Sequence, residues 1–213
     1  MDIRWNLSAS DIERESFRAI ESECPLRETL PEPEWRVARR LIHSTADIHI
    51  ADTLVFRHQP IDAGLSALRR RAPLFCDSKM LRSGLSMARL RALHPDYNPD
   101  CLHCYIDDPD VVARARAEGR TRALCGVEKA RPMLDGAIVL IGNAPLALAR
   151  IARYILEEKL RPALVIGMPV GFVNVVESKE LLSLCPVPHI ALEGRRGGSP
   201  LAVAALHAIL ESA

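Results

Sequence analysis

The stretch AIVLIGNAPLALARIARYILEE, residues 137–158, decides the fold. It opens with a short apolar run that ends in Gly142, continues through Asn143 and Pro145, and then carries apolar residues at helical spacing. A wholly apolar short run predicts a strand that is covered on both faces, and the pattern after Pro145 predicts a helix. A strand, a polar turn and a helix in this order predict one unit of a parallel α/β sheet.

The same alternation recurs through the chain. Other short apolar runs predict strands at residues 73–76, 102–106, 163–167 and 188–192. Apolar periodicity predicts helices at residues 10–24, 33–44, 61–70, 173–184 and 200–211, and a further helix can start after Pro109. We therefore expect an α/β fold in which a single domain, residues 1–213, holds about five parallel strands with helices on both faces.

Composition narrows the classes of protein to which the chain can belong. Its 213 residues carry a formal net charge of +1, which provides no basic field for nucleic acid. The first ten residues have no apolar core of a secretory signal, and no apolar run is long enough to span a membrane. Six irregularly spaced cysteines then favour reduced thiols. We expect a cytoplasmic protein that binds neither nucleic acid nor membrane.

Small and polar residues follow the predicted strands, where an open α/β sheet binds its ligands. GNAP, residues 142–145, combines a tight turn, a polar Asn143 and a helix start. GRRGGS, residues 194–199, precedes the last predicted helix, and this pattern is typical of a cradle for a carboxylate or a phosphate. Each stretch also fits an ordinary reading, as a strand-to-helix turn or as a solvated loop with surface arginines.

Cys101 and Cys104 form the only C-x-x-C pair of the sequence, and His103 lies between them. A structural zinc ion usually needs four ligands from two such pairs. No second pair exists, and the segment itself has the pattern of a strand. We therefore expect buried thiols here and no metal site.

His43 stands near the end of the second predicted helix, one turn after Arg40 on the same face. An ordinary imidazole titrates at ~6.5, so that a histidine is suited to give or take a proton near neutral pH. An arginine beside it would bind an anionic substrate. On the pattern alone, a helix-terminal histidine that is bonded to a backbone carbonyl is the more common case.

Taken together, eight stretches of the chain resemble the precorrin-8X methylmutase family of cobalamin biosynthesis, including its cobalt-precorrin-8 branch. They extend over nearly the whole chain in the order found in the family. The stretches are ESF (15–17), IHSTAD (42–47), CDSKM (76–80), HCYIDDP (103–109), TR (121–122), GNAP (142–145), PVGFVNVVESKE (169–180) and GRRGGS (194–199).

The resemblance implies a parallel α/β sheet, a homodimer and an isomerase that moves a methyl group from ring carbon 11 to carbon 12 of (cobalt-)precorrin-8 to give a corrin. It assigns the catalytic histidine to His43 and substrate contacts to Ser16 and Arg40, and it places Arg122 and Asn143 near the substrate. It implies no cofactor, since any cobalt arrives within the substrate. IHSTAD and CYIDDP resemble the cobalt-dependent branch more closely.

The implied chemistry suits these residue types. Protonation of a ring nitrogen withdraws electrons from the macrocycle and lowers the barrier to migration of the methyl group. Arginine side chains can bind the carboxylates of the substrate. Leu146, Lys79 and Ala123 depart from the family pattern, which leaves details of the pocket open. Two other hypotheses remain at this point: a non-catalytic corrinoid carrier, and a phosphate-binding α/β enzyme that uses GRRGGS.

Overall fold

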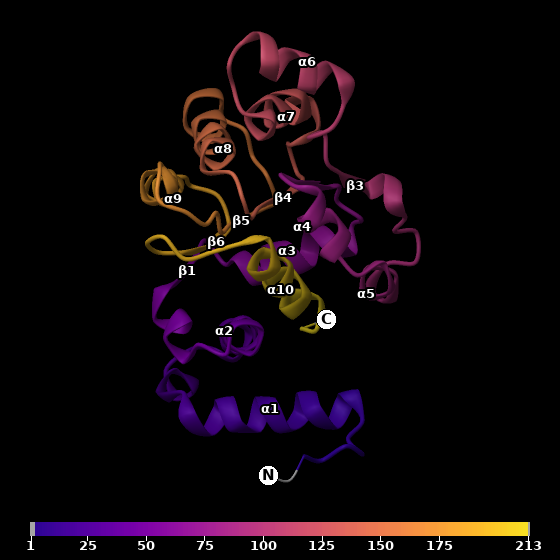
Figure 1. The fold of residues 1–213 in the computed structure, drawn as a ribbon, viewed down its shortest axis with the longest axis vertical. Helices are drawn as coiled ribbons and strands as arrows, with labels where there is room; N and C mark the ends of the chain where they lie inside the picture. Colours follow the sequence, from indigo (N-terminus) through magenta and orange to yellow (C-terminus); the bar gives the residue numbers. More distant parts are fainter. Residues whose placement is uncertain (1–2, 213) are drawn as a thin grey trace.

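The computed structural model describes residues 3–212 and has a six-stranded mixed sheet with helices on both faces (Figure 1). The strands are β1 (Leu54–Arg57), β2 (Leu74–Cys76), β3 (Leu102–His103), β4 (Ile138–Ile141), β5 (Leu164–Gly167) and β6 (His189–Leu192). Their order across the sheet is β1-β6-β5-β4-β2-β3.

The five predicted strands are confirmed, and they pair in parallel. The sequence missed β1, which pairs antiparallel with β6 at the edge of the sheet, with Leu54 opposite Leu192. β1 is four residues long, only partly buried, and ends in an exposed arginine, so it lacks the apolar run of a covered strand. β3 keeps only two residues of the predicted run at 102–106 because the chain turns away after His103.

In the described part of the chain, ten α-helices connect and flank the strands. They are α1 (Ala9–Glu23), α2 (Glu32–Thr45), α3 (Pro60–Arg69), α4 (Lys79–Gly84), α5 (Met87–Leu93), α6 (Pro109–Ala117), α7 (Arg122–Ala130), α8 (Pro145–Glu158), α9 (Val175–Ser183) and α10 (Ser199–Leu210). The bounds predicted for α8 are confirmed, whereas α1 begins earlier than expected, because Ser8 accepts the backbone N–H of Asp11 as its N-cap. Within residues 3–212, no helix has the length and apolar character needed to cross a membrane.

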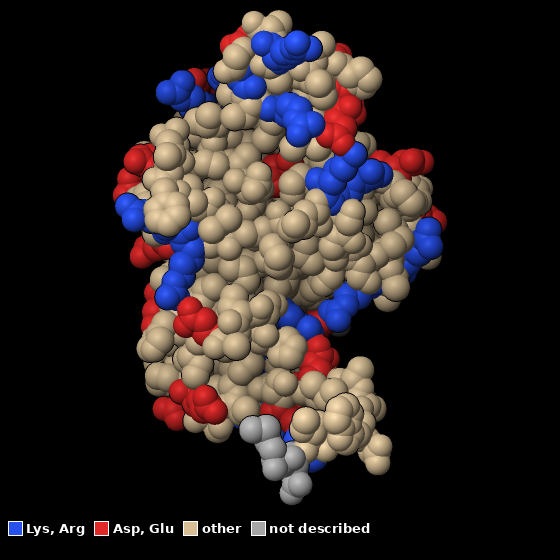
Figure 2. Space-filling model, viewed as in Figure 1, with Lys and Arg blue, Asp and Glu red and all other residues tan. Residues whose placement is uncertain are grey.

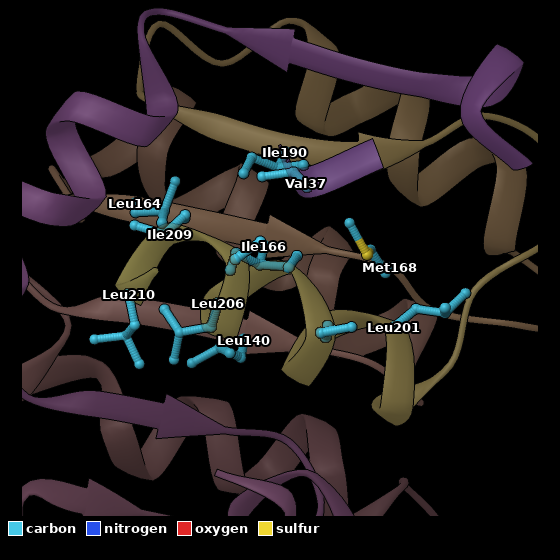
Figure 3. Packing of buried hydrophobic residues seen from close by; sticks show 14 of the residues in the cluster. Val37, Leu140, Leu164, Ile166, Met168, Ile190, Leu201, Leu206, Ile209 and Leu210 are labelled. Carbon is cyan, nitrogen blue, oxygen red and sulfur yellow. The ribbon is translucent and has the colours of Figure 1, made fainter. Parts of the chain in front are cut away.

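Alternate strand residues point into two separate apolar cores. Leu140, Ile166 and Ile190 face a layer that contains α2, α3, α4, α5 and α10, while Val139, Val165 and Ala191 face α7, α8 and α9. α10 packs along the middle of the first face, where Leu206 and Ile209 lie against the strands (Figure 3). Burial on both faces explains why these strands read as continuous apolar runs.

The N-terminal helix lies outside this layered arrangement. α1 packs on α2, far from the sheet, and buries none of its own residues completely (Figure 1). α2, in contrast, buries Trp35, Leu41 and Ile42 against the core. The chain leaves α2 through a left-handed Ala46 and passes through the 3-10 helix η2 (Ile48–Thr53) to β1. This path carries the residues that follow His43 to the carboxyl edge of the parallel strands.

β2 and β4 form the switch point of the sheet. The connection from β2 runs to β3 at one edge, and the connection from β4 runs the other way to β5. The helices after these two strands cover opposite faces, α4 and α5 one face and α8 the other. Ligands of open α/β sheets bind in the crevice at such a point, beyond the carboxyl ends of the strands.

The structure yields a prediction for stability at acid pH, based on His207 of α10. Its Nε2 accepts the backbone N–H of Ser86, the N-cap of α5, at 3.1 Å. Burial, together with the nearby Arg89 and Arg40 guanidiniums, lowers the pKa of His207 to about 4, against the opposing effect of Glu211. Between pH 6.5 and 4, His207 is therefore protonated in the unfolded chain but largely neutral in the folded chain. The free energy of unfolding consequently falls as the pH falls through this window.

We expect His207→Gln, which still offers an oxygen to Ser86 but does not titrate, to reduce this loss by about 2 kcal/mol between pH 7 and pH 4. Urea unfolding of both proteins over that range measures it. Parallel stability curves for wild type and variant would contradict the role of His207.

Candidate active site

A buried carboxylate organises the switch point. Asp77 follows β2, and its side chain accepts hydrogen bonds from three consecutive backbone N–H groups of the GNAP turn, Gly142 at 3.2 Å, Asn143 at 2.8 Å and Ala144 at 2.8 Å. Burial raises the pKa of the Asp77 carboxyl, and these hydrogen bonds offset part of the rise. Asp77 therefore fixes the turn that presents Asn143 to solvent.

The loop after β6 packs tightly against the same turn. The hydroxyls of Ser78 and Ser199 lie 3.0 Å apart, which links the end of β2 to the start of α10. A Cβ atom at Gly142 would come within 2.5 Å of Ser199 Cα, so only glycine allows this approach. Gly142 of GNAP and Gly197 of GRRGGS, whose added Cβ atom would collide with the carbonyl oxygen of Met168, thus allow a close approach of backbones that a solvated loop would not need.

Lys179 of α9 anchors the other half of the Gly-rich loop. Its buried ammonium donates to the carbonyl of Gly194 at 2.8 Å and to that of Arg196 at 2.6 Å. Burial lowers the pKa of Lys179 to about 8. The Arg196 guanidinium in turn pairs with Asp47 at 2.7 Å, which ties the loop to the segment that follows α2. The loop is therefore held from α9 on one side and from the end of α2 on the other.

Arg122 and Asn143, predicted to lie near the substrate, line one hollow. Its volume is about 360 Å³, and its wall also includes Leu146, Val173 and Asn174. Arg122 opens α7 and pairs with Asp107 at 3.0 Å, and Lys79 pairs with the other oxygen of the same carboxylate. The three departures from the family pattern therefore all lie here: Leu146 and Ala123 in the wall of the hollow, and Lys79 at its ion pair.

Ser16, Arg40 and His43 form a second group around Phe17. The rings of Phe17 and His43 meet edge to face with centroids 5.4 Å apart, and the Arg40 guanidinium lies 5.1 Å from the Phe17 centroid. Ser16 precedes Phe17 on α1 and donates back to the carbonyl of Ile12 at 2.7 Å. Phe17 is thus one of the contacts that align α1 with the last turns of α2, beside the Arg40–Glu13 and Arg39–Glu21 ion pairs.

The imidazole of His43 is free for chemistry. It is half-buried, and within residues 3–212 neither ring nitrogen has a hydrogen-bond partner. The bonds at the helix end do not involve it: Ser44 and Thr45 donate to the carbonyls of Arg40 and Leu41, and Ala46 donates its N–H to Ile42. The alternative given by the sequence, a helix-terminal histidine that is bonded to a backbone carbonyl, therefore does not apply to His43.

Arg40 is more engaged than its neighbour. Its guanidinium donates to Glu13 of α1 at 2.7 Å and to Glu211 after α10, and Arg89 pairs with the same Glu211. Burial acts to lower the pKa of Arg40, but the hydrogen bonds and charges of Glu211 and Glu13 outweigh it, and the pKa rises. Arg40 therefore joins α1, α2 and α10 in addition to lying beside His43.

The predicted site residues thus fall into two groups, Ser16, Arg40 and His43 at the α1–α2 contact and Arg122 and Asn143 at the switch point. No hydrogen bond or ion pair joins the groups directly within the part of the chain that is described. The Arg196–Asp47 pair is the link between their surroundings. Sequence reasoning did not predict the roles of Asp77, Lys179 or Phe17, although Lys179 is one of only four lysines in an arginine-rich chain.

No three His, Cys, Asp or Glu side chains among residues 3–212 are arranged to hold a metal ion. Cys101 and Cys104 are free thiols, and Arg71 Nε donates to Cys101 at 3.4 Å. Figure 2 shows a face whose centre carries few charged side chains, with both Lys or Arg and Asp or Glu side chains around its rim.

An open α/β sheet whose switch point is shaped by glycine turns, with a free imidazole at a nearby helix end, defines a class of α/β enzymes that bind a ligand beyond the strands. Residues 11–212 match the profile of the precorrin-8X methylmutase family, and the chain belongs to that family. It is therefore an isomerase of cobalamin biosynthesis that catalyses an intramolecular methyl transfer.

Individual relatives cover almost the whole chain. A cobalt-precorrin-8 methylmutase of Leptospira interrogans is 39% identical over 209 residues, 94% of this chain and 92% of the relative. A precorrin-8X methylmutase of Pseudomonas aeruginosa is 36% identical over 93% of each chain. The crystal structure of a precorrin-8X methylmutase from Thermus thermophilus is similar with a TM-score of 0.84 and 42% identity over 95% of each chain.

The Asp77 arrangement leads to a stability prediction. Asp77→Ala leaves three buried backbone N–H groups without an acceptor, and we expect it to lower the free energy of unfolding by about 2–4 kcal/mol. Asp107→Ala, which removes an exposed carboxylate from the same edge, serves as the control and should cost less than about 1 kcal/mol. Urea unfolding measures both, and equal losses would contradict the organising role of Asp77.

Proposed function

We propose that the chain moves a methyl group from ring carbon 11 to carbon 12 of (cobalt-)precorrin-8 and releases a corrin, with His43 as the proton donor and acceptor. The observation that carries this proposal is the free, half-buried imidazole at the end of α2, which no capping bond occupies. Transient protonation of a ring nitrogen next to the migrating centre draws electrons from the conjugated system and lowers the barrier to migration. The same imidazole takes the proton back after the shift.

The other site residues bind and orient the macrocycle in this proposal. Arg40 lies beside His43 over the ring of Phe17, and Ser16 lies on the facing turn of α1. Arg122 and Asn143 line the hollow at the switch point, where a guanidinium and an amide suit a carboxylate arm and a polar ring substituent. The reaction rearranges one substrate, so the proposal includes no cofactor, and a cobalt ion enters only as part of the substrate.

We propose the cobalt-containing form as the preferred substrate. IHSTAD and CYIDDP favour that branch, and the relative from Leptospira interrogans bears the cobalt name. Comparison of kcat/KM for the cobalt and the metal-free substrate tests this choice. A higher value for the metal-free form would contradict it.

A cytoplasmic homodimer is the proposed working form. Apolar side chains near the N-terminal end support a contact between copies, since Ile3, Trp5 and Ile12 are each at least 50% exposed. Light scattering on the purified protein measures the assembly. A monomer at all concentrations used for activity would contradict the dimer.

For the chemistry itself we expect His43→Ala to lower turnover by at least about a hundredfold while substrate binding is retained, because proton transfer is lost but the contact surface is not. The change in the visible spectrum of the substrate measures conversion. His49→Ala removes an exposed imidazole of the neighbouring 3-10 helix and serves as the control. A fully active His43→Ala variant would contradict the assignment, and a wild-type protein that binds substrate without any spectral change would instead favour a corrinoid carrier.

A further inference from the structure

The loop between β5 and α9 exposes large apolar side chains, which are usually buried in a folded protein. Phe172 is 82% exposed and Val173 is 73% exposed, and Val170 beside them is also exposed. Single exposed apolar residues are ordinary, but adjacent ones at the carboxyl edge of the sheet form a patch that normally marks a binding surface. The proposed site residues do not include this loop.

The patch lies on a firmly held loop. Gly171 donates its N–H to the carbonyl of Arg195 at 3.2 Å, and Gly198 donates to the carbonyl of Met168 at 2.8 Å, so the loops after β5 and β6 are bonded to each other at two points. A Cβ atom at Gly197 would collide with the carbonyls of Met168 and Pro169, which shows how closely the two backbones pack. Lys179 of α9 also holds the loop after β6, because its ammonium donates to the carbonyls of Gly194 and Arg196. Phe172 is therefore presented by a preorganised support.

An unpaired cation borders the patch. The Arg195 guanidinium lies 5.3 Å from the centroid of the Phe172 ring and forms no ion pair with any residue between 3 and 212. Its neighbour Arg196, in contrast, is engaged with Asp47. Val173 also belongs to the wall of the hollow that contains Arg122 and Asn143, so the patch continues into the candidate site.

We propose that Phe172 and Val173 form a preformed apolar platform for one face of the tetrapyrrole, with Arg195 bound to a carboxylate at its rim. The inference rests on the proposed function, which supplies a ligand that is flat and apolar on its face and anionic at its edge. An exposed aromatic ring beside a free guanidinium complements both features. A contact between protein copies also favours an aromatic ring and an arginine, so the assembly state is one readout of the test.

The test compares Phe172→Ala and Arg195→Gln with Leu184→Ala, a control that removes an exposed apolar side chain at the other end of α9. Cobyrinic acid, a corrin of the type that the proposed reaction releases, is the probe. Its dissociation constant, measured by absorbance titration at two salt concentrations, is the first readout. Turnover, thermal unfolding and light scattering complete the set.

We expect Phe172→Ala to weaken cobyrinic acid binding and to raise KM by about tenfold, because a buried aromatic contact is lost. Its kcat, melting temperature, assembly state and salt dependence should remain those of the wild type. Arg195→Gln should weaken binding and also flatten its salt dependence, because it removes a charge contact. Leu184→Ala should match the wild type throughout.

If Phe172→Ala bound cobyrinic acid with the affinity of the wild type and had the same KM, the proposed platform would be refuted. A change of assembly state in that variant with unchanged affinity would overturn it too, because the patch would then be a contact between copies. Turnover by the wild type reports separately on the proposed function. A wild type that binds cobyrinic acid through Phe172 but does not isomerise the substrate would refute the proposed reaction and retain the platform.

Discussion

The Asp77 carboxylate is buried where β2 meets β4, and three backbone N–H groups of the GNAP turn converge on it. A buried carboxylate is costly unless its oxygens are satisfied, and the turn satisfies them only in one conformation. That conformation presents Asn143, lets Gly142 approach Ser199, and thereby sets where α10 and the Gly-rich loop begin. The exposed position of Asn143 at the hollow and the contact between the GNAP turn and the start of α10 both depend on this geometry.

Much of the fold could be predicted because both faces of the parallel strands are covered. Continuous apolar runs then mark the strands directly, as for β4 and β5, and Pro145 marks the start of α8. β1 was missed because an edge strand of four residues, one of them an exposed arginine, carries no such signal. The six-stranded mixed sheet therefore differs from the expected five-stranded parallel sheet only at its edge.

The candidate site was less accessible to sequence reasoning. GNAP and GRRGGS could be located by their position after strands, and His43 by its position at a helix end. The roles of Asp77 and Lys179 depend on contacts across 66 and 17 residues of chain, which no local pattern encodes. That Ser44 and Thr45 bond back to α2, while the His43 ring has no hydrogen-bond partner among residues 3–212, likewise became visible only in the folded chain. The family resemblance supplied roles that the residues alone left open.

The central claim is that one imidazole, free of structural bonds, meets the nitrogen edge of a macrocycle whose acidic arms are held by the loops at the carboxyl edge. A crystal structure of the protein with bound cobyrinic acid tests it most directly. The account predicts a ring nitrogen of His43 within about 3.5 Å of the macrocycle or of one bridging water. A macrocycle bound elsewhere, with the His43 ring out of its reach, would contradict the account.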